Sequence, residues 1–188
     1  MGNNLLGVVL CGGESRRMGR DKGLLLKDGI TWARVMADKL VNLGLEVVFS
    51  VNAGQVEHYN LQMPGAILVV DEIAIGGPLN GLLSVHTLFP DKDILLLACD
   101  MLDMDEATIA ALLEVWHTGT DEFYAFAEGG IFQPLCSIYT AAALAAPHTA
   151  ALMGRPLVIS LQQLLRKGKT KSLVPLRSEA FRNYNTLV

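Results

Sequence analysis

Short apolar runs alternate along the chain with segments in which apolar residues recur at helical spacing. The nearly continuous runs are typical of strands buried on both faces of a sheet, and they occupy residues 5–10, 46–51, 66–70 and 93–98. The helical patterns occupy residues 31–43, 78–88 and about 103–117. Gly44 is placed to end the first helix, Pro78 to open the second, and Asp103 or Asp105 to cap the third.

The pattern changes in the last third of the chain, where two strand-like segments, 122–127 and 135–139, are joined through Gly129-Gly130. Pro134 implies that the second strand begins there or lies on an edge, because proline cannot donate to a sheet ladder.

One further helix and one further strand are expected near the end. Ser160 opens a capping box, Gly168 ends the helix that follows it, and residues 171–176 form a candidate last strand. Neither linker nor repeat interrupts the alternation, so the sequence predicts one α/β domain with a mostly parallel sheet.

Composition narrows the class of protein. The 188 residues are 51% hydrophobic and 18% charged, which is typical of a well-buried globular chain, and the net charge of −4 argues against a nucleic-acid or anionic-membrane binder. No apolar run approaches the roughly 20 residues that a membrane span needs, and the best candidate, 141–153, is broken by Pro147 and His148. The 3 cysteines lie far apart, as expected of reduced thiols in a cytoplasmic protein.

Polar or charged residues follow each of the predicted parallel strands. A glycine-rich cationic loop follows the first strand, Asn52 the second, Asp71 the third and Asp100 the fourth. Because ligands of open parallel sheets collect beyond the carboxyl ends of the strands, these positions predict one binding site. Taken singly, Asp71 and Asp100 could also be helix caps, and Asn52 could be a turn residue.

The loop after the first strand reads GVVLCGGESRRMGRDK. Adjacent Gly12 and Gly13 let the backbone approach phosphate oxygens, Ser15 adds a hydroxyl, and Arg17 and Lys22 can reach charge that develops at phosphorus. A dinucleotide-binding GxGxxG pattern is absent. Gly168-Lys169-Thr170 lacks the first glycine of a Walker A loop and is expected to be a helix stop.

The loop resembles the xGGxSxRMGxDK signature of nucleotidyltransferases, and in particular of the molybdenum cofactor guanylyltransferase family. Further matching segments follow in the family's order, namely Asp71 with Gly-Pro-Leu-Asn-Gly at 77–81, Cys-Asp-Met at 99–101 and Asn-Tyr-Asn-Thr at 183–186. The resemblance implies a single three-layer, Rossmann-like domain of the nucleotide-diphospho-sugar-transferase type. Because the loop cations of the first half are committed to the nucleotide, we expect a nucleotide-binding part over 1–118 and an acceptor-side part over 119–188.

The family's reaction is the transfer of GMP from GTP to molybdopterin with release of pyrophosphate. By resemblance, Leu10, Cys11 and Gly12 would contact the nucleotide and Lys22 its phosphates. Asn52 and Asp71 would contact the guanosine part, and Asp100 would hold Mg²⁺. The catalytic set is then Arg17, Lys22 and Asp100.

Departures from the family pattern bear on the choice of base. Cys11 replaces a usual alanine and Asn80 a usual small apolar residue, and both fall near the expected base pocket. Cytidylyl transfer to the same cofactor, nucleotidyl transfer to a sugar or alcohol phosphate, and a non-catalytic nucleotide-binding regulator therefore stay open as alternatives.

The acceptor is expected against the strand pair 122–139 and the segment after it. Arg155, between Gly154 and Pro156, is the candidate anchor for the pterin, and the alternative is a solvated arginine in a loop. The sequence leaves open whether a protein partner delivers the cofactor.

Overall fold

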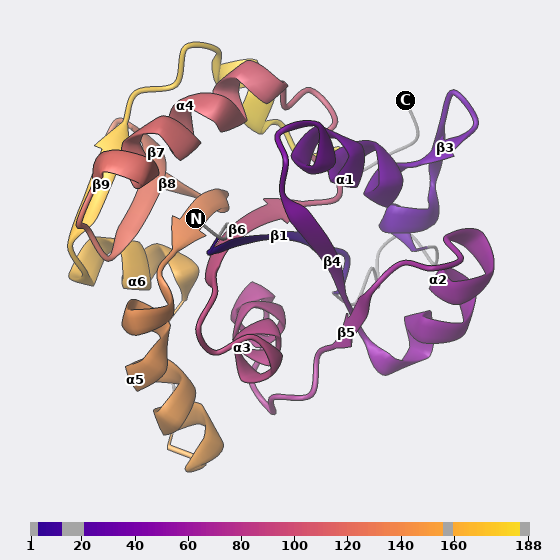
Figure 1. The fold of residues 1–188 in the computed structure, drawn as a ribbon, viewed down its shortest axis with the longest axis horizontal. Helices are drawn as coiled ribbons and strands as arrows, with labels where there is room; N and C mark the ends of the chain where they lie inside the picture. Colours follow the sequence, from indigo (N-terminus) through magenta and orange to yellow (C-terminus); the bar gives the residue numbers. More distant parts are fainter. Residues whose placement is uncertain (1–3, 13–20, 156–159, 185–188) are drawn as a thin grey trace.

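The protein is described by a computed structural model that covers residues 4–12, 21–155 and 160–184. A seven-stranded sheet in the order β5-β4-β1-β6-β8-β7-β9 forms its centre (Figure 1). The strands are β1 (Leu5–Leu10), β4 (Glu46–Val51), β5 (Leu68–Val70), β6 (Asp93–Ala98), β7 (Phe123–Glu128), β8 (Ile131–Tyr139) and β9 (Thr170–Leu173). Only β8 runs against its neighbours, so the mostly parallel sheet is confirmed.

Helices cover both faces of the sheet and make the expected three layers (Figure 1). One layer holds α1 (Trp32–Asn42) and α4 (Glu106–Thr118), and the other holds α3 (Pro78–Leu88), α5 (Ala141–Leu152) and α6 (Leu161–Lys167). The connections carry α2 (Val56–Gln62), the hairpin β2 (Leu26–Lys27) with β3 (Ile30–Thr31), and the 3-10 helices η1 (Lys22–Leu24), η2 (Ala53–Gln55) and η3 (Ser178–Phe181). No helix in the described part of the chain is long and apolar enough to cross a membrane.

Strand β1 shows why the central runs are continuously apolar. Leu5 and Val9 pack into the core beneath α1 and α4, whereas Leu6, Val8 and Leu10 pack into the core shared with α3 and α6. Both faces of the strand are therefore buried, and a polar residue on either face would lose its contact with water.

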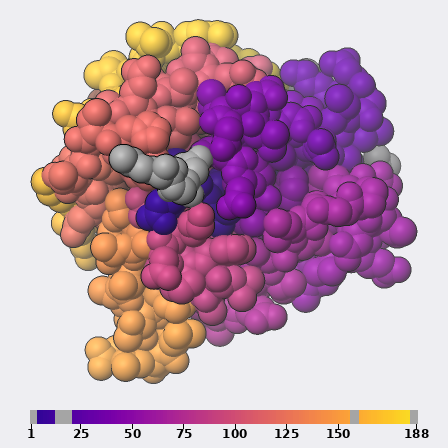
Figure 2. Space-filling model, viewed as in Figure 1, coloured from indigo at the N-terminus to yellow at the C-terminus, as the bar shows by residue number. Residues whose placement is uncertain are grey.

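Two segments differ from the sequence-based expectation. Pro134 neither starts β8 nor lies on an edge strand, because β8 begins at Ile131 and pairs with both β6 and β7. The proline falls where the β7–β8 register shifts between Ala125 and Ala127, an irregularity that removes the need for its missing N–H. Residues 141–152 form α5 despite an internal Pro147, and Figure 2 shows the end of this helix projecting from the rest of the surface.

The order of the strands defines where a ligand can bind. The chain passes from β1 to β4 and β5 on one side, then returns to place β6 on the other side of β1. The carboxyl ends of β1 and β6 flank this reversal, and crevices of this kind form the usual ligand sites of open α/β sheets.

Candidate functional site

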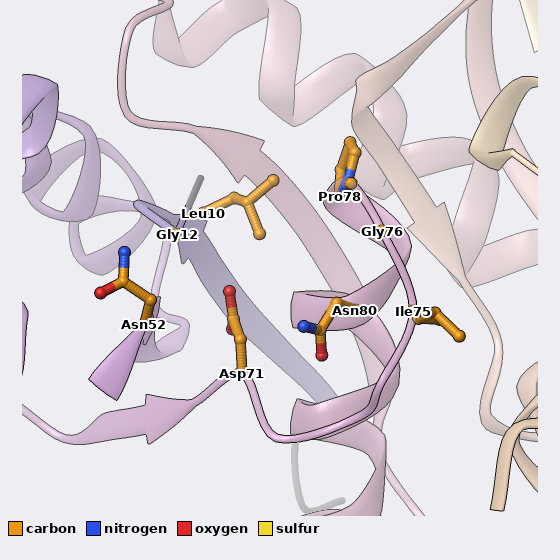
Figure 3. A pocket seen from close by; sticks show the side chains of 9 residues that line it. Leu10, Gly12, Asn52, Asp71, Ile75, Gly76, Pro78 and Asn80 are labelled. Carbon is orange, nitrogen blue, oxygen red and sulfur yellow. The ribbon is translucent and has the colours of Figure 1, made fainter. Parts of the chain in front are cut away.

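A pocket of about 620 Å³ opens beyond the carboxyl ends of β1, β4 and β5 (Figure 3). Its lining residues are Leu10, Gly12, Asn52, Asp71, Ile75, Gly76, Gly77, Pro78 and Asn80. Four residues that the sequence predicts as nucleotide contacts are thus brought together, namely Leu10, Gly12, Asn52 and Asp71. The volume is in the range of pockets that bind cofactor-sized ligands.

Asp71 stands in the middle of this pocket. Its backbone N–H donates to Val51 O at 2.8 Å, and its Oδ1 accepts the Ser50 hydroxyl at 2.6 Å. Burial raises the pKa of the Asp71 carboxyl, although the Ser50 hydrogen bond acts in the opposite direction. A Cβ at Gly12 would collide with Asp71 Oδ2, so the pocket needs glycine at the end of β1.

The segment before α3 forms the opposite wall. Gly77 has φ of 77°, which favours glycine, and Pro78 follows at the first helical positions, where its missing N–H costs nothing. Asn80 lies in the first turn of α3. Its Oδ1 accepts the Ile73 N–H and the Ser84 hydroxyl, both at 3.1 Å.

An ion pair lies on the other side of β1, beside β6. Lys22 Nζ is 2.9 Å from Asp100 Oδ2, and the two side chains are 22% and 15% exposed. The sequence places these residues 78 positions apart, and the fold joins them at the reversal of the strand order. The pair adjoins the glycine loop, which starts at the end of β1 and leads to Lys22.

A polar network holds both ends of the glycine loop. Asp21 accepts hydrogen bonds from Gly23 N at 3.0 Å, Gln55 Nε2 at 2.6 Å and Tyr59 Oη at 3.2 Å. Gln55 Nε2 also donates to Cys11 O at 3.1 Å. Burial raises the pKa of the Asp21 carboxyl, and these hydrogen bonds oppose the shift. Sequence reasoning missed Gln55 and Tyr59, because no local motif marks them.

A family model described as the MobA-like NTP transferase domain matches residues 7–179. The chain belongs to the MobA-like NTP transferase family. It is therefore a nucleotidyltransferase, as the glycine loop indicates.

Relatives of this MobA-like chain carry molybdenum cofactor names. A probable molybdenum cofactor guanylyltransferase from Opitutus terrae is 31% identical over 96% of this chain and 89% of its own length. A molybdenum cofactor biosynthesis bifunctional protein from Synechocystis is 30% identical over 74% of this chain, which spans only 40% of that protein.

Solved structures share the fold at lower identity. Molybdopterin-guanine dinucleotide biosynthesis protein A from Archaeoglobus fulgidus has a TM-score of 0.76 and 17% identity, over 97% of this chain and 92% of that one. Rv0371C from Mycobacterium tuberculosis, solved in complex with manganese, has a TM-score of 0.64 and 16% identity, over 91% and 88% of the two chains.

Of the remaining residues that the sequence predicts for the site, the structure describes some and not others. Gly13, Ser15 and Arg17 lie outside the described residues. Cys11 is buried at the end of β1 and is 7% exposed, and a contact with Cys11 together with burial raises the pKa of the Cys99 thiol well above its usual range. A protonated thiol is a poor nucleophile, so Cys99 suits the role of a small strand-end residue.

Arg155 does not join the pocket. It is exposed just beyond α5, where its backbone N–H donates to Ala150 O at 3.0 Å. Helix α5 follows β8, whose last residues pair with the amino end of β6. The helix therefore starts at the amino ends of the parallel strands, whereas the pocket lies beyond their carboxyl ends. The role of Arg155 as an acceptor anchor stays a prediction.

The acidic residues of the site could supply only part of the ligand shell of a divalent cation. In the described part of the chain, no group of three or more His, Cys, Asp or Glu side chains could hold a metal ion by itself. Asp100 offers a single hard oxygen ligand beside the glycine loop. Such a site suits Mg²⁺, which usually keeps waters and takes phosphate oxygens together with one or two carboxylates.

Proposed function

We propose that this nucleotidyltransferase transfers GMP from GTP to molybdopterin, producing the guanine dinucleotide form of the molybdenum cofactor and pyrophosphate. The observation that carries the proposal is the meeting of Leu10, Gly12, Asn52 and Asp71 in one pocket beside the Lys22–Asp100 pair. The name of the Opitutus terrae relative, a probable molybdenum cofactor guanylyltransferase, supports the choice of base and acceptor.

The topology supports one orientation of the nucleotide. The pocket lies on the β4 and β5 side of β1, and the ion pair lies on the β6 side. The guanosine part would fill the pocket between Asn52 and Asp71, and the triphosphate would cross the glycine loop toward Lys22. Backbone N–H groups of the loop and the Lys22 ammonium would then neutralise the phosphate charge.

The reaction needs no protein nucleophile. A phosphate oxygen of the acceptor attacks the α-phosphorus, and the bond from that phosphorus to the bridging oxygen breaks as pyrophosphate leaves. The protein contributes position and charge: the loop backbone, Arg17 and Lys22 would stabilise negative charge on the transferring group. Asp100 would hold Mg²⁺, which when bound supplies further neutralisation of that charge.

We assign the acceptor side to residues 119–188. Strand β8 is antiparallel to β6 and its first residues extend beyond the carboxyl end of that strand, together with the last residues of β7. The β7–β8 turn at Gly129 and Gly130 therefore lies at the same edge of the sheet as Asp100. An acceptor placed there could bring its phosphate to the α-phosphorus, in line with the bond to the leaving pyrophosphate.

The decisive experiment measures pyrophosphate release from GTP, CTP, ATP and UTP, with and without molybdopterin. We expect release from GTP that depends on molybdopterin. Asp100→Asn should lower it by at least about a hundredfold because the metal ligand is lost, whereas Asp91→Asn, on an exposed loop, should not change it. A preference for CTP, or no dependence on the acceptor, would contradict the proposal.

A further inference from the structure

The Asn80 carboxamide has a fixed orientation in the pocket wall. Its Oδ1 accepts from the Ile73 backbone N–H at 3.1 Å, and only the oxygen end of the amide can accept from an N–H. The Ser84 hydroxyl donates to the same oxygen at 3.1 Å and also contacts the Glu72 N–H at 3.0 Å. The amide nitrogen is thereby turned the other way, and Figure 3 shows it on the side of Asp71.

Asn80 Nδ2 is a donor that this folded chain does not use. Within the described residues it has no hydrogen-bond partner, although its oxygen has two. It belongs to a residue that lines the pocket, so a ligand there can satisfy it. Asn80 is half-buried, so water can reach this donor in the free protein. A ligand that displaces the water without offering an acceptor would leave the donor buried and unpaired, at a cost of about 1–3 kcal/mol, and a matching acceptor on the ligand is therefore favoured.

Asp71 supplies the complementary group. Its Oδ1 is occupied by the Ser50 hydroxyl, whereas Oδ2 faces Gly12 and accepts no hydrogen bond from the described residues. The two walls of the pocket therefore present a donor from Asn80 and an acceptor from Asp71. A ligand edge that binds both must carry an acceptor next to a donor.

We propose that Asn80 is a specificity-determining residue whose Nδ2 donates to a keto oxygen on the nucleobase, while Asp71 accepts from the adjacent ring N–H. This inference rests on the proposed function, because it takes the pocket to be the base site. The 6-keto group and N1–H of guanine match the pattern. Adenine and cytosine present an amine beside an unprotonated ring nitrogen, which would place like groups against both side chains.

The test is a substitution that preserves the hydrogen bonds of the pocket wall but replaces the donor at position 80 by an acceptor. Asn80→Asp retains an oxygen for the Ile73 N–H and the Ser84 hydroxyl, and replaces the pocket donor by an acceptor. Ser84→Ala is the matched control, because it weakens the support of the same loop and keeps the Asn80 amide, whose Oδ1 still accepts from the Ile73 N–H.

The measurement is the dissociation constant of GTP, ITP and ATP for each variant by titration calorimetry. ITP keeps the keto group and ring N–H of GTP but lacks its 2-amine. Asn80→Asp should weaken GTP and ITP by the same factor, at least about tenfold, and leave ATP unchanged or tighter. Ser84→Ala should change all three by one common factor. If Asn80→Asp does not fold, Asn80→Ala should still lower the GTP-to-ATP affinity ratio by at least about threefold.

Several outcomes would overturn the inference: an unchanged ratio in Asn80→Asp, an equal loss for all three nucleotides, or a wild-type protein that binds ATP as tightly as GTP. These binding measurements use no acceptor. Absence of GMP transfer to molybdopterin would therefore refute the proposed function without touching the Asn80 result, and an unchanged affinity ratio would refute the role of Asn80 without touching transfer.

Discussion

The Lys22 ammonium occupies the approach to the one carboxylate to which the metal is assigned. Lys22 Nζ lies 2.9 Å from Asp100 Oδ2, and both side chains are largely shielded from water. A divalent cation that binds Asp100 in the nucleotide-free protein must come close to this positive charge. At such short range, the repulsion between the two cations raises the free energy of metal binding by on the order of 1 kcal/mol or more. With a triphosphate bound, Lys22 has phosphate oxygens as alternative partners. We therefore expect metal and nucleotide to bind together better than either binds alone.

Lys22→Gln should have opposite effects on metal binding in the nucleotide-free protein and in the GTP-bound protein. In the nucleotide-free protein we expect the affinity for Mn²⁺ to rise by at least about threefold, because a like charge is removed. In the presence of GTP we expect metal–nucleotide binding to weaken, because a phosphate contact is lost. Free Mn²⁺ measured by electron paramagnetic resonance reports both. Lys27→Gln, on the exposed β2–β3 hairpin, is the control, and a change of the same sign in both states would contradict the charge argument.

Asp71→Asn should stabilise the fold while it impairs binding. Burial raises the pKa of Asp71, so its contribution to stability is present below the unfolded-state pKa and is lost as pH rises through the folded-state pKa. At pH 7, where the carboxyl of the unfolded chain is ionised, the raised pKa of Asp71 is therefore a cost to stability that asparagine removes. Asparagine also keeps an oxygen for the Ser50 hydroxyl.

We expect a higher Tm for Asp71→Asn at pH 7, by about 2–4 °C for each kcal/mol of relief, and a smaller difference from wild type near pH 4. Thermal unfolding at the two pH values measures this, and GTP titration measures the loss of affinity. A lower Tm at pH 7, or a difference that does not depend on pH, would show that the carboxylate serves the fold.

Among secondary-structure elements, those with a strong pattern could be predicted and those with a mixed pattern could not. Helix α3 spans residues 78–88 as its Pro78 start indicates. Helix α5 was not predicted, because its Ala-rich sequence shows no apolar stripe and Pro147 stands inside it. The β2–β3 hairpin was also missed, although Asp28 and Gly29, with φ of 53° and 82°, carry the Asp-Gly signal of a tight turn.

The contact between α3 and α5 should make the protein sensitive to acid. The His86 and His148 rings lie 5.1 Å apart, edge to face, and His86 is 3% exposed with its Nδ1 unpartnered within the described residues. Burial and then the neighbouring His148 lower the pKa of His86, and Asp91 acts in the opposite direction. The unfolded chain thus binds the proton more readily, so stability is lost as pH falls below about 6.5.

His86→Leu should reduce this acid-dependent loss. We expect the fall in Tm between pH 7.5 and pH 5.5 to be smaller in His86→Leu than in wild type, because the buried group that must be protonated is gone. His58→Asn, on an exposed position of α2, should leave the fall unchanged. If His58→Asn has the larger effect, the acid sensitivity arises outside the α3–α5 contact.

For the molecule as a whole, the location of the site could be predicted from the sequence, but the long-range hydrogen bonds that support it could not. Polar residues after each parallel strand had to meet at one edge of the sheet, and Asn52, Asp71 and Asp100 do follow the ends of β4, β5 and β6. The contacts from Asp21 to Gln55 of η2 and Tyr59 of α2 span 34 and 38 residues and depend on the path of the chain after β4. Such contacts leave no periodic signal in a single sequence.

The end of the described chain also returns to the site. The Tyr184 backbone N–H donates to Asp100 O at 2.9 Å, its hydroxyl donates to Asp103 Oδ2 at 2.7 Å, and its ring packs edge-on against Trp32 of α1. These contacts of Tyr184, which we call the Tyr184 strap, connect helix α1 to the loop that carries Asp100 and Asp103. We expect the strap to hold the Asp100 carboxylate in position during transfer.

Tyr184→Phe tests the strap, with Tyr139→Phe as the matched control. Each change removes one tyrosine hydroxyl hydrogen bond, to Asp103 in the first case and to Pro134 O at 2.8 Å in the second. Each should therefore cost about 1 kcal/mol of stability. Only Tyr184→Phe should also lower GTP-dependent pyrophosphate release per folded molecule, by at least about threefold, because a small displacement of a positioning group reduces the rate. Tm and turnover measured on both variants separate the two effects, and an equal loss of turnover in both would show that the strap contributes stability alone.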